Sequence, residues 1–204
     1  MTADAPANDT MSDDHLIEHR VQQEELLRGH FLHALRDTVR LPNQSLATRE
    51  YVVHPGAVMV IPMLDTPEGL RLVMERQFRY PVGQVMTEFP AGKLDPGEDP
   101  WLCAQRELLE ETGYSARQWA RAGVLHPVIA YSTEVIEIWF AKDLSLGPRQ
   151  LDKDEFLDVF TCTPDELMAG CQQGRVTDAK TLTGLLWLQN VRSGLWPLTW
   201  QTLP

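Results

Sequence analysis

GKLDPGEDPWLCAQRELLEETGY is the sequence of residues 92–114, and the rest of the chain is organised around it. The stretch holds four glutamates, which are Glu98, Glu107, Glu110 and Glu111. Glu107 lies three residues before Glu110 and four before Glu111, so a helix places these carboxylates on neighbouring positions of one face. Like charges at such spacings repel, whereas a hard cation such as Mg²⁺ or Mn²⁺ converts the repulsion into attraction. The stretch therefore predicts a metal-holding helix, with a solvated acidic helix face as the alternative.

The same residues follow the pattern G-x5-E-x7-R-E-U-x-E-E-x-G-U, where U is bulky and hydrophobic. Leu108 and Tyr114 take the two U positions. This pattern resembles the Nudix box, which belongs to a family of enzymes that cleave pyrophosphates. The resemblance implies that Glu107 and Glu111 bind a divalent metal directly, and that Glu110 is a further ligand or its outer partner. Mg²⁺ is the implied cofactor, with Mn²⁺ as the alternative.

The family resemblance also implies roles for residues that flank the glutamates. In one subgroup of the family, which further stretches of this chain resemble, the backbone carbonyl just before the box glycine is a further metal ligand, and Ala91 takes that position. Arg106 is expected to orient the glutamates through a salt bridge to Glu98 or Glu110, because a guanidinium carries its donors in a rigid fork. A simple surface cation is the alternative for Arg106. Glu111 and Arg106 are therefore candidate catalytic residues as well.

A second acidic segment lies outside the box, at residues 152–156, which read DKDEF. The box does not assign the base that activates water, and a carboxylate on another loop could close over the substrate. Glu155 is therefore a candidate for the catalytic base or for a distant metal ligand. A solvated acidic turn is the alternative interpretation.

Composition limits the class of protein. The chain has 204 residues and a formal net charge of −11, which disfavours a broad nucleic-acid surface. Its longest apolar run, residues 57–64, is too short to span a bilayer, so no membrane partner is expected. Three cysteines without a C-x-x-C pair indicate neither a disulfide framework nor a zinc site, and they favour a reducing cytoplasm.

Hydrophobic patterning divides the chain into three segments. Residues 1–15 are polar and acidic and are expected to form a disordered leader, and residues 16–55 are expected to form a small antiparallel β-meander. Residues 56–204 then read as strands before and after a central helix, followed by two more helices, which is typical of a mixed α/β sheet covered by helices. The Nudix resemblance implies an α/β/α sandwich for this last segment.

Three helices are expected in that segment. The central helix follows Pro100, with Leu102 and Leu109 predicted to face the core on the side opposite the glutamates. Thr163 and Asp178 are expected to cap the other two helices. The last helix is predicted to bury four residues, which are Leu182, Leu185, Leu186 and Gln189.

Several stretches beyond the box resemble the ADP-ribose pyrophosphatase subgroup of the Nudix family. They are residues 49–58 (REYVVHPGAV), 76–81 (RQFRYP), 88–94 (EFPAGKL), 154–156 (DEF) and 178–186 (DAKTLTGLL). The subgroup implies hydrolysis of the pyrophosphate of ADP-ribose to AMP and ribose 5-phosphate. It also implies a homodimer in which the N-terminal meander is swapped and lines the partner's site.

Substrate-binding candidates come from the same resemblance. Arg79 could pair with the pyrophosphate, Arg49 lies in the matching stretch before the domain, and Glu134 could contact a ribose or a metal. A surface position is the alternative for Arg79, and a solvent-facing strand end is the alternative for Glu134.

One departure from the subgroup keeps other functions open. Residues 128–134 read VIAYSTE, where many members carry Ser-Pro-Gly. Another nucleoside diphosphate sugar such as GDP-mannose is therefore an alternative substrate. A non-catalytic module that binds a nucleotide metabolite is the alternative of another class, which the intact set of four glutamates disfavours. Processing of RNA ends is disfavoured by the acidic charge.

Overall fold

The computed structural model describes residues 12–151, 153 and 155–203. These residues form two compact units. The first unit runs to Val53 and includes Ala130–Ser132, and the second comprises His54–Ile129 and the residues from Thr133 onward. The leader expected at residues 1–15 falls largely on residues 1–11, which lie outside the described part of the chain.

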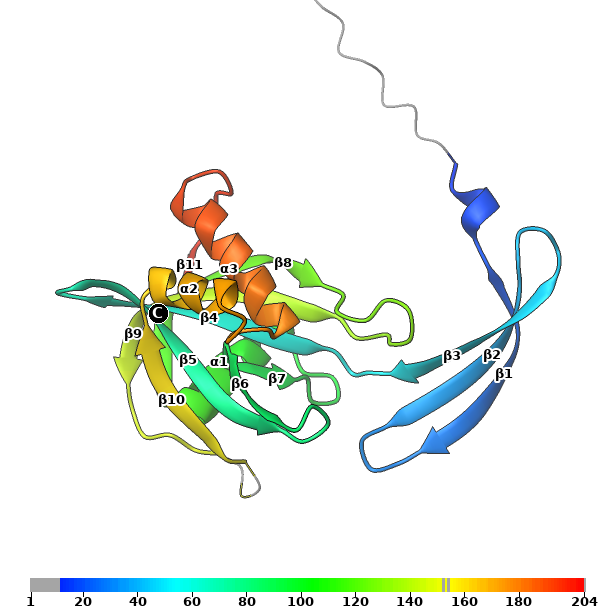
Figure 1. The fold of residues 1–204 in the computed structure, drawn as a ribbon, viewed down its shortest axis with the longest axis horizontal. Helices are drawn as coiled ribbons and strands as arrows, with labels where there is room; N and C mark the ends of the chain where they lie inside the picture. The colour runs from blue at the N-terminus through cyan, green and yellow to red at the C-terminus, as the bar shows by residue number, and fades with distance from the viewer. Residues whose placement is uncertain (1–11, 152, 154, 204) are drawn as a thin grey trace, which may run out of the picture. The chain divides into compact units, whose positions relative to one another are not determined.

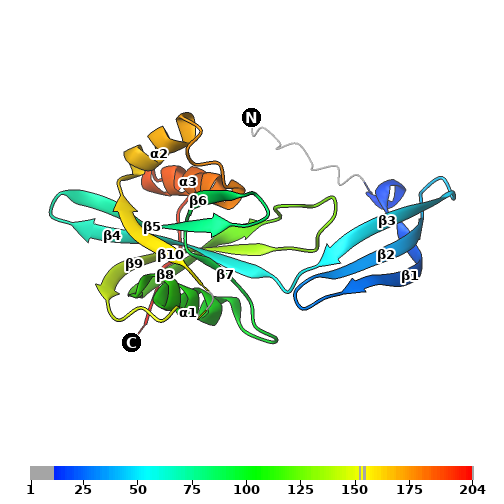
Figure 2. The same cartoon turned by 60° about the horizontal axis from the view of Figure 1, so that its bottom comes forward.

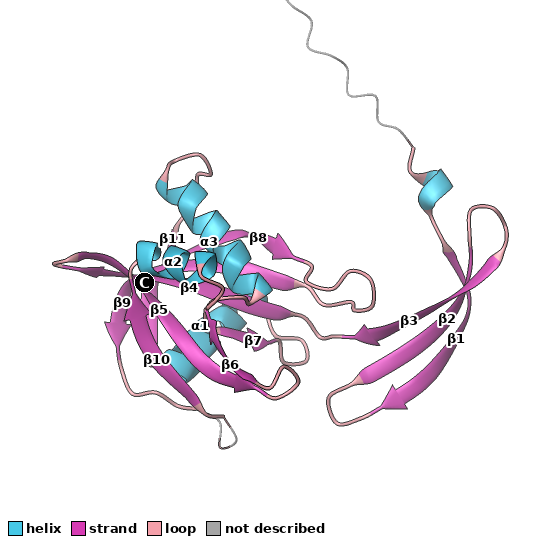
Figure 3. Cartoon of the chain, in the orientation of Figure 1, coloured by secondary structure: helices cyan, strands magenta, loops and turns pink. Residues whose placement is uncertain are grey.

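The first unit contains an antiparallel three-stranded sheet, as the sequence predicted (Figure 3). A short 3-10 turn, Asp14–Leu16, precedes the strands β1 (His19–Arg28), β2 (His33–Arg40) and β3 (Leu46–Val53). On the central strand, Leu35, Asp37 and Val39 are buried, whereas Arg36 and Thr38 between them are partly exposed. This period of two is the pattern of a sheet with one protected face.

A mixed sheet forms the centre of the second unit (Figure 1). Within the described residues it has eight strands in the order β10-β5-β4-β9-β8-β11, with β6 paired to β5 and β7 paired to β4. The β4–β9 pair is parallel and the other pairs are antiparallel. The strands are β4 (Ala57–Thr66), β5 (Gly69–Arg79), β6 (Gln84–Glu88), β7 (Ala91–Lys93), β8 (Tyr114–Leu125), β9 (Ile136–Leu146), β10 (Leu157–Cys162) and β11 (Gln201–Thr202).

Helices cover both sides of this sheet, which confirms the predicted α/β/α sandwich. Figure 2 shows α1 (Pro100–Thr112) on one side of the strands, with α2 (Pro164–Gln172) and α3 (Ala179–Arg192) on the other. Alternate residues of the buried strand β4 supply two separate apolar cores. Val58 and Val60 pack toward α1, whereas Met59 and Ile61 pack toward α2 and α3. A continuous apolar run is what a strand covered on both faces requires.

The ends of the helices follow the expected capping chemistry. Asp99 accepts the backbone N–H groups of Trp101 and Leu102, and Gly113 ends α1 in a left-handed conformation with φ 76°. Thr163 forms a complete capping box with Glu166, and Asp178 accepts the backbone N–H of Thr181, so both predicted caps are confirmed. The start and the direction of α1, and therefore of its glutamates, are thus fixed locally.

The predicted core stripe of α1 is wrong. Leu102 is 58% exposed, and the buried residues of the helix are Cys103, Ala104, Leu108, Glu111 and Thr112. Small side chains at positions 103 and 104 let the helix lie close to β4. The consequence is that one glutamate of the helix points inward with the core residues and not away from them.

The predicted buried face of α3 is also wrong in part. Leu185 is buried, but Leu182, Leu186 and Gln189 are exposed, and Leu188 is buried in their place. Gly184 explains the rotation, because a Cβ at this position would lie 2.9 Å from both Met59 Cε and Phe89 Cε2. The close approach at the glycine sets which side of the helix faces the sheet.

Two strands of the sheet begin directly after a helix or a loop. β8 begins at Tyr114, next to the residue that ends α1, and β10 begins at Leu157 and leaves Phe156 81% exposed. The short strands β7 and β11 were not predicted.

Of the helices in the described residues, none has both the length and the apolar character needed to cross a membrane.

Candidate active site

Arg106 binds three of the four glutamates in residues 92–114. Its Nε and Nη2 donate to both oxygens of Glu98 at 2.8 Å, and its Nη1 donates to Glu107 Oε1 at 2.8 Å and to Glu110 Oε2 at 3.0 Å. The hydrogen bond from Arg106 lowers the pKa of Glu98 to about 2. The predicted salt bridge is therefore confirmed for both Glu98 and Glu110, and it extends to Glu107.

Glu107 lies against the backbone of β7. A Cβ added at Gly92 would lie 1.9 Å from Glu107 Cδ, so only glycine leaves room for the carboxylate. The nearby carbonyl of Lys93 accepts from Arg106 Nη2 at 3.2 Å and ties this strand to α1. Burial raises the pKa of Glu107 to about 7, even though Arg106 acts to lower it. The carboxylate is therefore held in a partly dehydrated position where an extra cation would stabilise its charge.

Glu111 is the most buried carboxylate of the helix, with 3% of its surface exposed. Its Oε2 accepts the backbone N–H of Ala91 at 3.1 Å. Burial raises its pKa well above the ordinary value, and the charges of Glu75, Glu107 and Glu155 act in the same direction. This electrostatic influence shows that four carboxylates from α1, β5 and the loop before β10 share one region.

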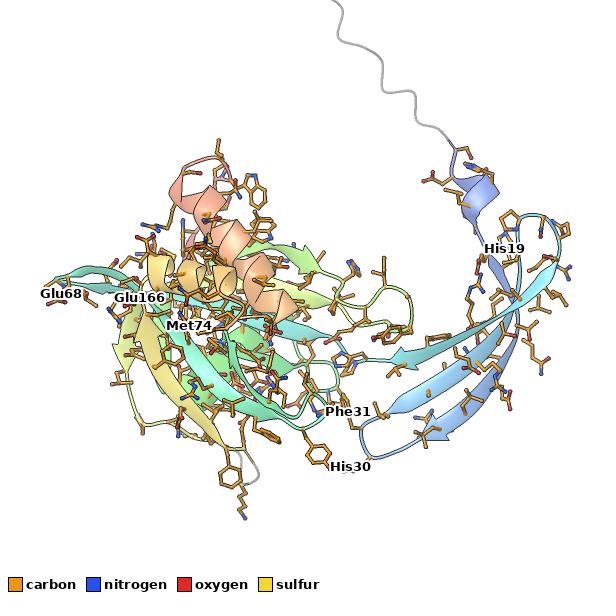
Figure 4. All side chains as sticks on the ribbon, in the orientation of Figure 1. His19, His30, Phe31, Glu68, Met74 and Glu166 are labelled. Atoms are coloured by element: carbon orange, nitrogen blue, oxygen red, sulfur yellow. The ribbon has the colours of Figure 1, made fainter. Side chains whose placement is uncertain are left out.

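Glu75 was missed by sequence reasoning. It lies on β5 next to Met74, a core residue that Figure 4 labels, and it is 2% exposed. Burial raises the pKa of Glu75 to about 7, and its side chain interacts with Glu111. One of its oxygens, Oε1, is buried without a hydrogen-bond partner among the described residues. The available signal was weak, because Glu75 directly follows the apolar residues 72–74 but is itself followed by Arg76 and Gln77.

Glu155 lies at the edge of the same region. Its Oε1 accepts from Gln77 Nε2 at 3.4 Å, and its charge raises the pKa values of Glu75, Glu107 and Glu111. It also lines an open cavity of about 400 Å³ together with Arg76, Phe78, Val85, Arg149, Leu151, Phe156, Leu157 and Asp158. Residues 152 and 154 lie outside the described part of the chain.

The remaining candidates fall in three places. Arg79 makes a bidentate ion pair with Glu88 at 2.7 and 2.8 Å and is close enough to Glu111 for that charge to raise its pKa. Glu134 lies 3.8 Å from His54 Nε2 through its Oε1. Arg49 belongs to the first unit, where it forms an ion pair with Glu18. The structure therefore brings Arg79 close to the carboxylates. The substrate-binding roles of Glu134 and Arg49 stay predictions.

The donor chemistry of the site fits a hard divalent cation. Glu75, Glu107 and Glu111 supply carboxylate oxygens, and Oε1 of Glu75 is buried without a hydrogen-bond partner among the described residues. Gly92 lacks the Cβ that would overlap the Glu107 carboxylate. Within the described residues, no three acidic, histidine or cysteine side chains already converge at ligand spacing. Binding an ion would therefore require rotations of glutamates such as Glu107, which turns one oxygen to Arg106.

Because the site buries carboxylates, we expect the stability of the metal-free protein to fall as the pH rises. A carboxyl group whose pKa is raised on folding stabilises the folded state fully below its unfolded value near 4.3, and this contribution is lost as the pH rises through about 7. Glu75→Gln removes one charge without changing shape. In EDTA, its Tm minus the wild-type Tm should therefore grow between pH 5 and pH 8, by roughly 5 °C.

Differential scanning fluorimetry of both proteins measures this difference, and subtraction cancels the groups that titrate identically in the two chains. Mg²⁺ should reduce the difference at pH 8 if a cation neutralises the same carboxylates. An equal Tm difference at pH 5 and pH 8 would contradict the raised pKa of Glu75.

The chain is similar in sequence and in fold to known proteins. The NUDIX domain family matches residues 53–184. The ADP-ribose pyrophosphatase of Bacillus subtilis is 36% identical over 176 residues, covering 85% of this chain and 94% of that protein. The methanol dehydrogenase activator of Bacillus methanolicus is 39% identical over 176 residues, covering 84% and 92%. A solved ADP compounds hydrolase covers 87% of this chain and 95% of its own with a TM-score of 0.77 at 22% identity, a likeness of fold.

Proposed function

Because the chain belongs to the Nudix family, we propose that it hydrolyses the pyrophosphate of ADP-ribose, with one water, to AMP and ribose 5-phosphate. The observation that carries the proposal is the group of four carboxylates around Glu111, held beside the glycine that admits Glu107. The similarity to an ADP-ribose pyrophosphatase over most of its length supports the choice of substrate.

Mg²⁺ or Mn²⁺ is the proposed cofactor. When bound, such an ion supplies charge neutralisation on the phosphates and lowers the pKa of a coordinated water. We assign its binding to carboxylates Glu107, Glu110 and Glu111, to the carbonyl of Ala91 and to Glu155. The protein's own part is to hold these oxygens in place, which Arg106 does for Glu107 and Glu110, and the Ala91 N–H does for Glu111.

A base must accept the proton of the attacking water. Glu155 is the proposed base, because it is less buried than Glu111 and adjoins an open cavity while still lying within the electrostatic reach of the other carboxylates. Arg79 is the proposed contact of the pyrophosphate, since it places a cation beside the acidic region. Arg49 and Glu134 are proposed to bind other parts of the nucleotide sugar.

A substrate panel tests the function directly. The purified chain is incubated with ADP-ribose, other ADP-sugars and GDP-mannose, with Mg²⁺, with Mn²⁺ and with EDTA, and products are separated by anion-exchange chromatography. The proposal requires AMP and ribose 5-phosphate from ADP-ribose with a metal and neither product in EDTA. Preferential cleavage of GDP-mannose would move the assignment to another nucleoside diphosphate sugar. Binding of ADP-ribose without any cleavage would favour a non-catalytic module.

A homodimer is the proposed assembly, with the β-meander exchanged between subunits. The first unit exposes large apolar side chains that a partner could cover, including Leu16, Val21, Leu27 and Leu46. Sedimentation of the full chain should show a dimer, and removal of the residues before Val52 should give a monomer with reduced activity. A fully active monomer after that truncation would contradict the exchange. A cytoplasmic location is proposed as well, in keeping with three free cysteines.

A further inference from the structure

Glu88 is a charged residue in an almost fully buried position. It ends β6, is paired across the strands with Glu75 of β5, and has a side chain that is only 3% exposed. Burial acts to raise the pKa of Glu88, but the hydrogen bonds and charges of Arg79 and Lys180 outweigh it and leave the pKa below its ordinary value. The carboxylate is therefore ionised and needs both cations.

The two cations reach Glu88 from different elements. Arg79, on β5, donates from Nε to Oε1 at 2.7 Å and from Nη2 to Oε2 at 2.8 Å. Lys180, in the first turn of α3, donates to Oε2, and its Nζ also lies 3.1 Å from Asp178 Oδ2. Glu88 thus joins the β5–β6 hairpin to the start of a helix from the far end of the sequence.

The first turn of α3 is itself fixed against the strand. The backbone N–H of Phe89 donates to Thr181 Oγ1 at 3.1 Å, and the backbone N–H of Thr181 donates to the capping Asp178. The close packing at Gly184 against Phe89 prevents the helix from moving toward the sheet. The backbone of Lys180 is therefore held in place, and its ion pair with Glu88 limits the positions that the carboxylate can take.

The three charged side chains differ in how far they are exposed to solvent. The side chains of Glu88 and Lys180 are 3% and 13% exposed, whereas that of Arg79 is 39% exposed. The bidentate pair uses Nε and Nη2 of the guanidinium, so the Nη1 edge is directed away from Glu88 and can donate to another acceptor. That cation lies close enough to Glu111 for the two charges to interact.

We propose that Glu88 and Lys180 are positioning residues, which hold the Arg79 guanidinium so that its Nη1 edge binds a phosphate of a nucleoside diphosphate sugar. The proposal rests on the function argued above. A buried ion pair contributes little to stability compared with well-packed apolar groups, because desolvation offsets most of its attraction. Holding a partly exposed arginine in one orientation before substrate arrives, in contrast, removes an entropic cost of binding.

The test uses Lys180→Met, which removes one cation and leaves the Arg79–Glu88 pair in place. Glu88→Gln is the second variant, with greater risk to folding because it leaves two cations facing an uncharged group. Glu137→Gln is the matched control, since Glu137 also forms an ion pair with an arginine, Arg121, at 2.7 Å on strands β8 and β9. Thermal unfolding of each variant verifies that it is folded.

Two measurements report on the position of Arg79. With Mg²⁺, Lys180→Met is expected to raise KM for ADP-ribose by about tenfold, with a smaller change in kcat, and Glu137→Gln should match wild type. In EDTA, where no turnover is expected, calorimetry should show the same loss of ADP-ribose affinity. Because Lys180 acts through Arg79, the double variant Arg79→Lys/Lys180→Met should bind ADP-ribose no more weakly than Arg79→Lys alone.

The outcomes are distinguishable from failure of the proposed function. A wild-type chain that forms no AMP with Mg²⁺ or Mn²⁺ contradicts the function, and the affinity in EDTA still decides the positioning role. Equal affinity of wild type and Lys180→Met, or no measurable affinity in either, overturns the inference. So does an additive effect in the double variant, because a purely structural lysine would weaken binding independently of Arg79.

Discussion

Glu111→Gln is expected to lower kcat for ADP-ribose hydrolysis by roughly 10³-fold, the scale seen when a group that stabilises charge in a transition state is removed. The amide keeps the shape of the side chain and can still accept the backbone N–H of Ala91. It cannot carry the negative charge that holds a divalent cation. The steady-state rate of AMP formation with saturating Mg²⁺ measures the effect.

Unfolding cannot account for such a loss. Glu111 is buried and its pKa is raised, so the ionised carboxylate is costly in the metal-free protein and a neutral amide should leave Tm unchanged or raise it. Glu68→Gln is the control for the same chemical change, because Glu68 is exposed in the turn between β4 and β5 (Figure 4). It should retain wild-type kcat. A Glu111→Gln protein with more than one tenth of wild-type kcat would contradict the role assigned to this carboxylate.

Gly92→Ala is expected to lower kcat/KM by roughly 10²-fold while the fold is kept. The added Cβ would lie 1.9 Å from Glu107 Cδ and 2.0 Å from its Oε1. The atoms that must yield are the end of a flexible side chain and not backbone, so the strain is relieved by moving the carboxylate. Glu107 would then leave the position next to β7 in which it can act with Glu111.

Kinetics and Mg²⁺ titration together verify this effect. The concentration of Mg²⁺ at half-maximal activity should rise in Gly92→Ala, whereas Tm should change little. Gly147→Ala is the matched control, since a Cβ there meets only the carbonyl of Gly113 at 3.7 Å, an ordinary contact. Wild-type Mg²⁺ dependence in Gly92→Ala would show that Glu107 need not lie close to residue 92.

The fold and half of the site could be predicted from sequence because their signals are local. The caps at Thr163 and Asp178, the left-handed Gly113 and the register of the glutamates each depend on residues a few positions apart. Arg106 was correctly predicted to bind neighbouring glutamates for the same reason: they are within reach on one turn of helix and the preceding loop.

The errors arose where long-range packing decides. The stripe of Leu102 and Leu109 has helical spacing, yet the helix turns Leu108 and Glu111 inward instead. Spacing alone does not say which of several apolar faces fits the sheet. Gly184 decides the same question for α3 through contacts with Phe89 and Met59, two residues distant in sequence.

The sequence by itself determined that this chain carries a Nudix box on a capped helix, and hence a row of carboxylates able to attract a divalent cation. Only the tertiary structure decided that Glu75 stands beside Glu111, and that Glu88 is enclosed by Arg79 and Lys180. Spacing along the chain reports contacts within one turn of helix. The charge balance of a buried carboxylate depends on which strands and helices desolvate it, and those lie far away in sequence.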